Sequence, residues 1–232
     1  YYEKYKVRRY GFHGTSHSFV SKRVAEIVGK PYNATKTIVC HLGNGASVSA
    51  VLNGESVDTS MGLTPVEGLM MGTRCGDVDA GALVFIQEKE GLDYKGVSTL
   101  INKKSGVLGI SGISSDMREI ENAVAQGNEK AKLALTMYEY RIVKYIGAYA
   151  AALNGVDVIV FTGGVGENQA ISREAVCNQL SFMGVEIDKE LNKKIHGKEV
   201  ELSTPASKVR VVVTPTDEEL MIALDTQHIV MK

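Results

Sequence analysis

The sequence predicts an α/β fold with a mixed β-sheet flanked by helices. Three short strands follow one another in the first quarter of the chain, and strands then alternate with helices towards its end. Successive strands joined by tight turns pair antiparallel, whereas strands separated by a helix pair in parallel. A chain that contains both arrangements therefore predicts one mixed sheet with helices on its faces.

The first three strands are predicted from β-branched residues, alternation and turn signals. Residues 37–42 are short and rich in β-branched side chains, and residues 46–52 alternate partly between polar and apolar. Asn53-Gly54 is the strongest short hairpin signal, and it places a returning strand at 55–59. Gly43-Asn44-Gly45 then forms the first turn of a β-meander.

The later elements alternate between helix and strand. Residues 129–153 form the longest predicted helix, because apolar side chains recur at spacings of three and four, and Asn154-Gly155 ends it. A fully apolar strand follows, and acidic residues mark the first turn of the last helix. The further expectations are a strand at 156–161, a helix from about residue 172, a strand at 209–213 and a helix beginning near residue 217.

Composition limits the class of protein. The 232 residues are 44% hydrophobic and 23% charged, which is typical of a globular protein with one large or two small domains. The net charge of −1 argues against a nucleic-acid or membrane surface, and no apolar run reaches the roughly 18 residues of a membrane span. No signal-peptide pattern opens the chain. Since it begins with Tyr1, we expect a piece of a longer protein.

Three cysteines, none in a Cys-x-x-Cys pair, predict a reducing compartment rather than a disulfide framework. We therefore expect a cytoplasmic location.

Two glycine-rich segments are candidate ligand sites. Gly43-Asn44-Gly45 joins two strands, and a glycine there lets backbone N–H groups approach a phosphate, although a plain hairpin turn explains it equally well. Residues 163–168 follow a buried strand, where ligands bind in open α/β sheets. The segment is neither a P-loop nor a dinucleotide fingerprint, because the Gly-Lys-Ser/Thr ending and the glycine spacing are absent. Its glycine density favours ligand contact over a plain loop.

A histidine pair is the third candidate. His13 and His17 are four residues apart, a spacing that binds a metal on a helix, but Gly14 between them weakens that reading. One histidine is usually structural, whereas two in a small polar segment favour a site.

Charged side chains complete the candidates. Arg74 lies between glycines, and a guanidinium clamps phosphate or carboxylate oxygens; a salt bridge to Asp77 is the equal alternative. Carboxylates of residues 217–219 suit Mg²⁺, with helix capping as the alternative. Asp116 raises the same question, since it begins a predicted helix with Glu119 as capping-box partner. Together the motifs contain the parts of a phosphoryl-transfer site.

These motifs resemble those of the acetate kinase family, within the acetate/sugar kinase–Hsc70–actin superfamily. The matching strings occur in the family's order and span nearly the whole chain, and they are closer to acetate kinase than to butyrate kinase. They are RRYGFHGTSH (8–17), VCHLGNGASVSA (39–50), GLTPVEGLMMGTRCGDVD (62–79), SGISSDMRE (111–119), FTGGVGENQ (161–169) and TPTDEEL (214–220).

The resemblance implies a ribonuclease H-like (actin-like ATPase) lobe, and it assigns roles to matching positions. His13 and Arg74 correspond to the pair that holds the transferring phosphoryl group, Pro65 to a wall of the acetate methyl pocket, and Glu218, with Glu219 beside it, to the magnesium-binding acid. The nucleotide-binding positions are His41, Leu42, Gly43, Asn44 and Gly45 at the phosphates, Gly164, Val165, Gly166, Glu167 and Asn168 at the adenosine, and Asp116, Met117 and Arg118 beside the nucleotide.

The resemblance also implies a function and partners. ATP would phosphorylate acetate reversibly, giving acetyl phosphate and ADP, with Mg²⁺ or Mn²⁺ as cofactor. Family members are nearly twice this length, so residues 1–232 correspond to a C-terminal nucleotide-binding and dimerisation lobe without the N-terminal lobe. We expect a homodimer, and little kinase activity from this chain alone. A non-catalytic actin-like module and a butyrate or propionate kinase remain the alternatives.

Overall fold

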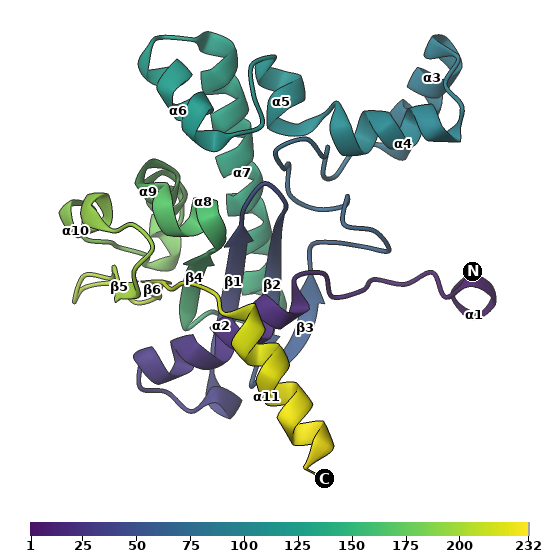
Figure 1. Ribbon diagram of the computed structural model, residues 1–232. Coiled ribbons are helices and arrows are strands. Elements are labelled where there is room, and N and C mark those ends of the chain that lie inside the picture. The colour runs from purple at the N-terminus through teal and green to yellow at the C-terminus, as the bar shows by residue number, and fades with distance from the viewer. Residues whose placement is uncertain (232) are drawn as a thin grey trace.

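A six-stranded mixed β-sheet forms the centre of the molecule (Figure 1). The computed structural model describes residues 1–231. The strands lie in the order β3-β2-β1-β4-β6-β5. Their bounds are Lys36–Leu42 (β1), Ala46–Leu52 (β2), Glu55–Thr59 (β3), Val158–Thr162 (β4), Val200–Glu201 (β5) and Arg210–Val213 (β6). The predicted meander is confirmed, and the predicted α/β class with it.

Strand direction decides where the loops lie. β1 pairs antiparallel with β2 through Leu42 and Ala46, which are joined by the turn at 43–45. β4 runs parallel to both β1 and β6, with His41 beside Thr162 and Phe161 beside Val213. The carboxyl ends of β1, β4 and β6 therefore meet at one edge of the sheet, the edge at which open α/β sheets bind ligands.

Two helices cover the two faces of the sheet. α7 (Glu129–Ala152) packs on one face, where its apolar residues join Ile38 and Cys40 of β1 in the larger core cluster. α2 (Gly14–Ile27) packs on the other face, against Val39 of β1. Successive side chains of a strand point to opposite faces, so β1 contributes to both clusters. Burial on both faces explains the unbroken apolar runs at 38–40 in β1 and at 158–161 in β4.

The remaining helices lie around this centre. α3 and α4 form an arm that extends away from the sheet, and α11 projects from the opposite side (Figure 1). None of the helices in residues 1–231 has the length and apolarity to span a membrane. The bounds are Tyr2–Tyr5 (α1), Ala80–Glu90 (α3), Tyr94–Lys103 (α4), Gly106–Ser111 (α5), Met117–Ala125 (α6), Gly163–Asn168 (α8), Ala170–Gln179 (α9), Lys189–Lys194 (α10) and Glu218–Val230 (α11), with 3₁₀ turns at Tyr32–Ala34 and Ser181–Met183.

Several predicted boundaries differ from the structure. The strand expected at 156–161 is β4, at Val158–Thr162, and the helix expected from residue 172 begins at Ala170. The glycine-rich segment at 163–168, for which a plain loop was the alternative to ligand contact, is the short helix α8. Gly163 adopts a φ of 77°, and a Cβ there would lie 2.8 Å from the carbonyl oxygen of Leu42. Glycine is therefore required for the close approach of this segment to β1.

Candidate functional site

A cavity of about 700 Å³ opens at the edge where β1 and β4 end. Its size lies within the roughly 300–1,000 Å³ of small-molecule sites. Three segments far apart in the sequence form its walls: the β1–β2 turn, the start of α6, and α8 with the residue that follows it. The lining residues are Gly43, Asn44, Ser115, Asp116, Met117, Arg118, Glu121, Gly164, Val165, Asn168 and Gln169.

The β1–β2 turn is held in place from two sides. Within it, the N–H of Gly43 donates to the carbonyl oxygen of Gly45 at 3.0 Å. The N–H of Gly72 donates to the carbonyl oxygen of Asn44, also at 3.0 Å, and so ties the turn to the segment that carries Arg74. A Cβ on Gly72 would overlap Oδ1 of Asn44. Only glycine at position 72 leaves the Asn44 side chain where it is.

Arg74 is a half-buried cation with neutral partners. Its Nη1 donates to the carbonyl oxygen of Pro65 at 3.2 Å and lies 3.7 Å from Sδ of Met71. Within residues 1–231 no carboxylate pairs with this guanidinium. The salt bridge with Asp77, the alternative that the sequence left open, is absent from the structure.

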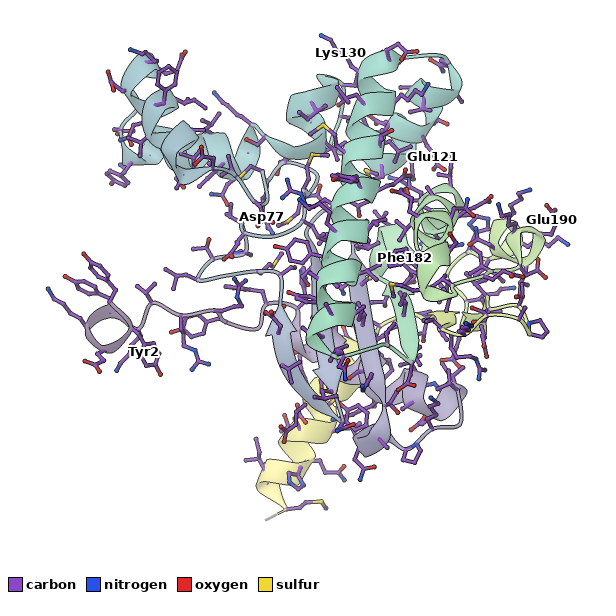
Figure 2. All side chains as sticks on the ribbon, turned by 180° about the vertical axis from the view of Figure 1, so that it is seen from behind. Tyr2, Asp77, Glu121, Lys130, Phe182 and Glu190 are labelled. Atoms are coloured by element: carbon purple, nitrogen blue, oxygen red, sulfur yellow. The ribbon has the colours of Figure 1, made fainter. Side chains whose placement is uncertain are left out.

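Asp77 pairs with α7 instead. Its Oδ2 lies 3.1 Å from Nη1 of Arg141 and accepts a hydrogen bond from the Tyr145 hydroxyl at 2.9 Å. Figure 2 shows Asp77 beside this helix. An arginine without a counter-charge attracts anions, and its planar fork suits phosphate or carboxylate oxygens.

His13 is held in an unusual backbone conformation. It precedes the first turn of α2 with a φ of 57°, in the left-handed region that non-glycine residues seldom adopt. Its ring stacks on that of His41 with 4.2 Å between centroids, and its Nδ1 lies 2.9 Å from Oγ of Ser47. The surroundings therefore determine the direction in which Nε2 points.

His13 and Arg74 converge on the β1–β2 turn. A Cβ built on Gly45 would lie 3.1 Å from Nη1 of Arg74 and 3.7 Å from Nε2 of His13. The two groups predicted to hold one phosphoryl group thus lie together beside the predicted phosphate turn. Gly45 leaves open the space between them.

The histidines of this cluster are neutral near pH 7. Burial, followed by the charge of Arg74, lowers the pKa of His13. Burial lowers the pKa of His17 to about 3 and that of His41 to about 4, with neighbouring histidines adding to both shifts. A neutral His13 offers a hydrogen bond rather than a positive charge.

Serine hydroxyls, rather than further metal-ligating side chains, bind the ring nitrogens of the His13–His17 pair. Both ring nitrogens of His17 bind serine hydroxyls, Nε2 with Ser47 at 2.7 Å and Nδ1 with Ser49 at 2.8 Å. In the described part of the chain, no three histidine, cysteine, aspartate or glutamate side chains come together as a metal site. The pair is a hydrogen-bonding cluster.

The start of α6 forms the wall opposite α8. Asp116 caps the helix by accepting from the N–H of Arg118 at 2.9 Å, and the two side chains form an ion pair of 2.6 Å. These bonds lower the pKa of Asp116 to about 2. The capping alternative is thus confirmed for Asp116, yet the same residues line the cavity. Capping and cavity lining coexist here.

Five of the predicted nucleotide residues do not line the cavity: His41, Leu42, Gly45, Gly166 and Glu167. The Glu167 carboxylate accepts from the N–H of Gly163 at 3.0 Å, at the start of its own helix, and burial raises its pKa. Gly166 packs against the backbone of β4, and Leu42 is buried in the core. Glu167 supports α8, so a direct contact with a ligand in this cavity is not expected of its side chain.

Glu218 is the exposed first residue of α11, and Asp217 caps that helix by accepting from Leu220 N–H at 2.9 Å. Because β6 leads into α11, Glu218 lies at the same sheet edge as the cavity, although it does not line it. Two residues earlier, the buried hydroxyl of Thr216 has no partner in residues 1–231. One carboxylate near phosphate oxygens fits Mg²⁺, which keeps several waters.

Sequence reasoning missed several residues of the site. Ser47 and Ser49 had indicated only the alternation of a strand, and their hydroxyls in fact bind the histidines. Ser16, inside the conspicuous polar segment with both histidines, binds Nδ1 of His41 at 2.8 Å. The signal was present, since serines at alternate strand positions share one face. Ser115 and Gln169 lie within the strings that match the family but had been given no role, and Glu121 lies outside those strings; all three line the cavity.

The sheet order and the cavity at the ends of its parallel strands define a ribonuclease H-like lobe, the fold of actin-like ATPases. Residues 1–224 match the Acetokinase family. The chain belongs to the acetokinase family.

Curated relatives agree over the whole chain. An acetate kinase of Parabacteroides distasonis is 64% identical over 231 residues, and one of Phocaeicola vulgatus is 66% identical over 231 residues. Each comparison covers 100% of this chain and 58% of the relative. The chain thus spans little more than half the length of the curated relatives it matches.

Solved structures agree with the fold. The acetate kinase of Porphyromonas gingivalis superposes with a TM-score of 0.96 at 62% identity, covering 99% of this chain and 57% of that one. A propionate kinase of Francisella tularensis superposes with a TM-score of 0.89 at 41% identity, covering 96% of this chain and 56% of that one.

Proposed function

We propose that this chain forms the C-terminal, nucleotide-binding lobe of an enzyme that transfers the γ-phosphoryl group of ATP to acetate, reversibly. Relatives named acetate kinase that are 62–66% identical over the chain support the reaction. The observation that carries the proposal is the convergence of Arg74 and His13 on Gly45, in the same turn whose Gly43 and Asn44 line a cavity of about 700 Å³.

The nucleotide occupies the cavity in this proposal. Its base and ribose lie between α8 and the start of α6, with Gly164 and Asp116 on opposite walls. Its phosphates follow the turn from Gly43 to Gly45. The terminal phosphate then reaches the space between Arg74 and His13, which a glycine keeps open.

The chemistry requires charge stabilisation more than proton transfer. Acetate is ionised at pH 7, so its oxygen attacks without a general base. The obstacle is the approach of one anion to another, and the transition state spreads negative charge over the phosphoryl oxygens. Arg74 supplies a positive charge that no carboxylate in residues 1–231 neutralises, and His13 supplies a hydrogen bond.

Glu218 is the residue we propose for Mg²⁺, with Mn²⁺ as a substitute. A bound divalent cation neutralises phosphate charge. The position of Glu218 at the start of α11 provides one carboxylate at this sheet edge, and waters and phosphate oxygens complete such a shell.

Two other functions are candidates for this chain: phosphorylation of propionate, and nucleotide binding without catalysis. The structural similarity to a propionate kinase supports propionate as a second substrate. Pro65 is the wall residue we propose for the acyl pocket; its carbonyl oxygen holds Arg74 at 3.2 Å. A purely nucleotide-binding module has no use for an unpaired arginine beside the terminal phosphate, so the unneutralised charge of Arg74 favours the kinase.

We further propose a cytoplasmic homodimer that binds only small-molecule substrates. All three cysteines, Cys40, Cys75 and Cys177, are free thiols, as a reducing compartment allows. The exposed apolar side chains Val84 and Phe85 on the arm formed by α3 and α4 are candidate dimer contacts.

The test uses two proteins, this chain and a form extended to the full length of the curated relatives. Hydroxamate trapping of acyl phosphate with acetate, propionate and butyrate gives the reaction and the chain-length preference. We expect the extended form to phosphorylate acetate best and the 232-residue chain to show little activity. No acyl phosphate from the extended form with any of the three acids would contradict the proposed function.

A further inference from the structure

Behind His13, two serines and a second histidine form an unbroken chain of hydrogen bonds. Oγ of Ser49 lies 2.8 Å from Nδ1 of His17, and Nε2 of His17 lies 2.7 Å from Oγ of Ser47. Oγ of Ser47 in turn lies 2.9 Å from Nδ1 of His13. Ser47 and Ser49 are 0% and 1% exposed and His17 is 6% exposed, so these contacts are shielded from solvent.

The number of protons available along this chain of hydrogen bonds limits the directions in which the bonds can run from donor to acceptor. A neutral imidazole has one N–H donor and one acceptor nitrogen, and a serine hydroxyl has one proton to donate. Ser47 contacts one nitrogen of each of two histidines and, among the described residues, no other side-chain partner, so its single proton is used only if it donates to one histidine and accepts from the other. The whole chain therefore runs in one of two directions, and each direction fixes the nitrogen of His13 that carries the proton.

The contacts of Ser49 select the direction. Among the described residues the Ser49 hydroxyl has one hydrogen-bond partner, Nδ1 of His17. Donation to that nitrogen uses the only proton of the hydroxyl; the reverse direction leaves this buried proton without a protein acceptor, which is unfavourable. His17 then carries its proton on Nε2 and donates to Ser47, and Ser47 donates to Nδ1 of His13.

We propose that Ser49, His17 and Ser47 are positioning residues that keep the proton of neutral His13 on Nε2. The ring then presents an N–H donor to the space beside Gly45 and Arg74. A donor in that place stabilises charge on phosphoryl oxygens, whereas a bare nitrogen repels it. Tautomer control by a hydrogen bond to the other ring nitrogen is a general device in histidine sites.

Arg74 opposes this arrangement in the absence of ligand. A positive guanidinium favours the tautomer whose Nε2 lone pair faces it, which is the tautomer with the proton on Nδ1. The serine–histidine chain holds the opposite tautomer before a ligand arrives. His13 is thus preorganised for an anion rather than for the empty site. If the chain of hydrogen bonds is interrupted, the charge of Arg74 shifts the proton of His13 towards Nδ1.

The distal end of the chain reaches a second, smaller cavity. Ser49 and His17 line a space of about 190 Å³ on the other side of this cluster, together with Ser18, Ser21, Ser56 and Thr59.

Two other contacts provide independent controls. Ser16 binds Nδ1 of His41 at 2.8 Å without touching the chain, and the Ser21 hydroxyl lies 3.1 Å from that of Tyr32.

Long-range ¹H–¹⁵N NMR of the histidine rings tests the tautomer directly in the 232-residue chain. We expect the wild-type protein to show His13 and His17 both protonated at Nε2. Ser47→Ala cuts the chain, so the His13 proton should spread over both nitrogens, while Ser16→Ala should leave it on Nε2. A wild-type His13 protonated at Nδ1 would overturn the proposal, as would a Ser47→Ala spectrum with an unchanged His13 ring.

Kinetics in the extended form then test the consequence, which rests on the proposed function. Ser47→Ala should lower kcat about tenfold, the rate equivalent of one ordinary hydrogen bond, with KM for ATP and acetate within about twofold. Ser21→Ala should change neither constant. An unchanged kcat for Ser47→Ala would contradict the positioning role. Absence of kinase activity would refute the proposed function alone, because the NMR result does not depend on turnover.

Discussion

Arg74 reaches the β1–β2 turn at Gly45, where a Cβ atom would lie 3.1 Å from its Nη1. The same atom would lie 3.7 Å from Nε2 of His13. Three parts of the chain therefore meet at Gly45: the loop that carries Arg74, the start of α2 with His13, and the β1–β2 turn. Glycine is needed at position 45 because a larger side chain would fill the space between Arg74 and His13. The backbone itself does not require glycine, since the φ of Gly45 lies outside the left-handed region.

The first prediction concerns this space. Gly45→Ala places a methyl group against Arg74 and His13, so the guanidinium shifts and kcat of the extended form falls by at least about tenfold. Folding should be unaffected, because alanine suits the backbone here. Gly147→Ala, in the interior of α7 with no heavy atom within 4 Å of the new methyl group, is the matched control. It should leave kcat unchanged and add about 0.5–1 kcal/mol of stability.

Removal of the guanidinium itself gives the second prediction. Arg74→Ala should reduce kcat by about 100-fold or more with a much smaller change in KM, because its contacts strengthen in the transition state. Arg74→Lys keeps the charge but loses the planar fork, and should recover only part of the rate. Steady-state kinetics of the extended form measure both. An unchanged kcat in Arg74→Ala would remove this residue from the mechanism.

The third prediction concerns a buried cation that supports α8. Arg173 is 1% exposed, and its guanidinium donates to the carbonyl oxygen of Gly166 at 2.9 Å, to Oδ1 of Asn192 at 2.8 Å, and to two further carbonyl oxygens. Arg173→Met leaves these buried acceptors unpaired and should lower the free energy of unfolding by about 3 kcal/mol. Urea denaturation of the 232-residue chain measures it.

Arg23→Met is the control for that measurement. Arg23 is a partly exposed surface residue whose guanidinium pairs with Glu26 and Glu199 at 2.7 Å each. Surface ion pairs contribute little. A loss of stability in Arg173→Met no larger than that in Arg23→Met would show that the buried network does not support the lobe.

The fourth prediction is a pH effect. Burial raises the pKa of Glu139 from 4.5 to about 7, and its Oε1 lies 2.9 Å from Oγ of Ser172. The folded state therefore binds the proton more tightly than the unfolded state. The stability that this group contributes is complete below pH 4.5 and is lost as pH rises towards and through about 7.

Glu139→Gln isolates this effect. His17 and His41, with lowered pKa values of about 3 and about 4, act in the opposite sense and lose stability as pH falls below 6.5. Their contribution cancels in the difference between the wild type and Glu139→Gln. We expect the variant to gain stability relative to the wild type between pH 5 and pH 8, as measured by urea denaturation. A difference independent of pH would contradict the raised pKa.

Local patterns predicted the elements that have one apolar face or an explicit turn. The long helix α7 was predicted because Ile142 and Ile146 belong to an uninterrupted apolar stripe. α2 was missed because the residues it buries include Ser16 and His17, so its inner face does not read as apolar. α3 buries no residue at all. Polar packing and exposure both remove the periodic signal.

The site was only partly predictable for a similar reason. Arg74 and the glycine turns stand out as residue types that bind phosphates. The direction in which the Glu167 side chain points could not be predicted, because it depends on a hydrogen bond to the backbone of its own helix at Gly163. The hydrogen bonds of Ser47 and Ser49 depend on how β2 packs against α2, a long-range contact that no local pattern contains.

A crystal structure of this chain with Mg²⁺ and a non-hydrolysable ATP analogue is the most direct measurement. We predict the adenosine between Asp116 and Gly164, the phosphates along the turn from Gly43 to Gly45, and the terminal phosphate within hydrogen-bond distance of Nη1 of Arg74 and Nε2 of His13. A nucleotide bound elsewhere, or one whose terminal phosphate lies away from both side chains, would contradict the assignment of this cleft.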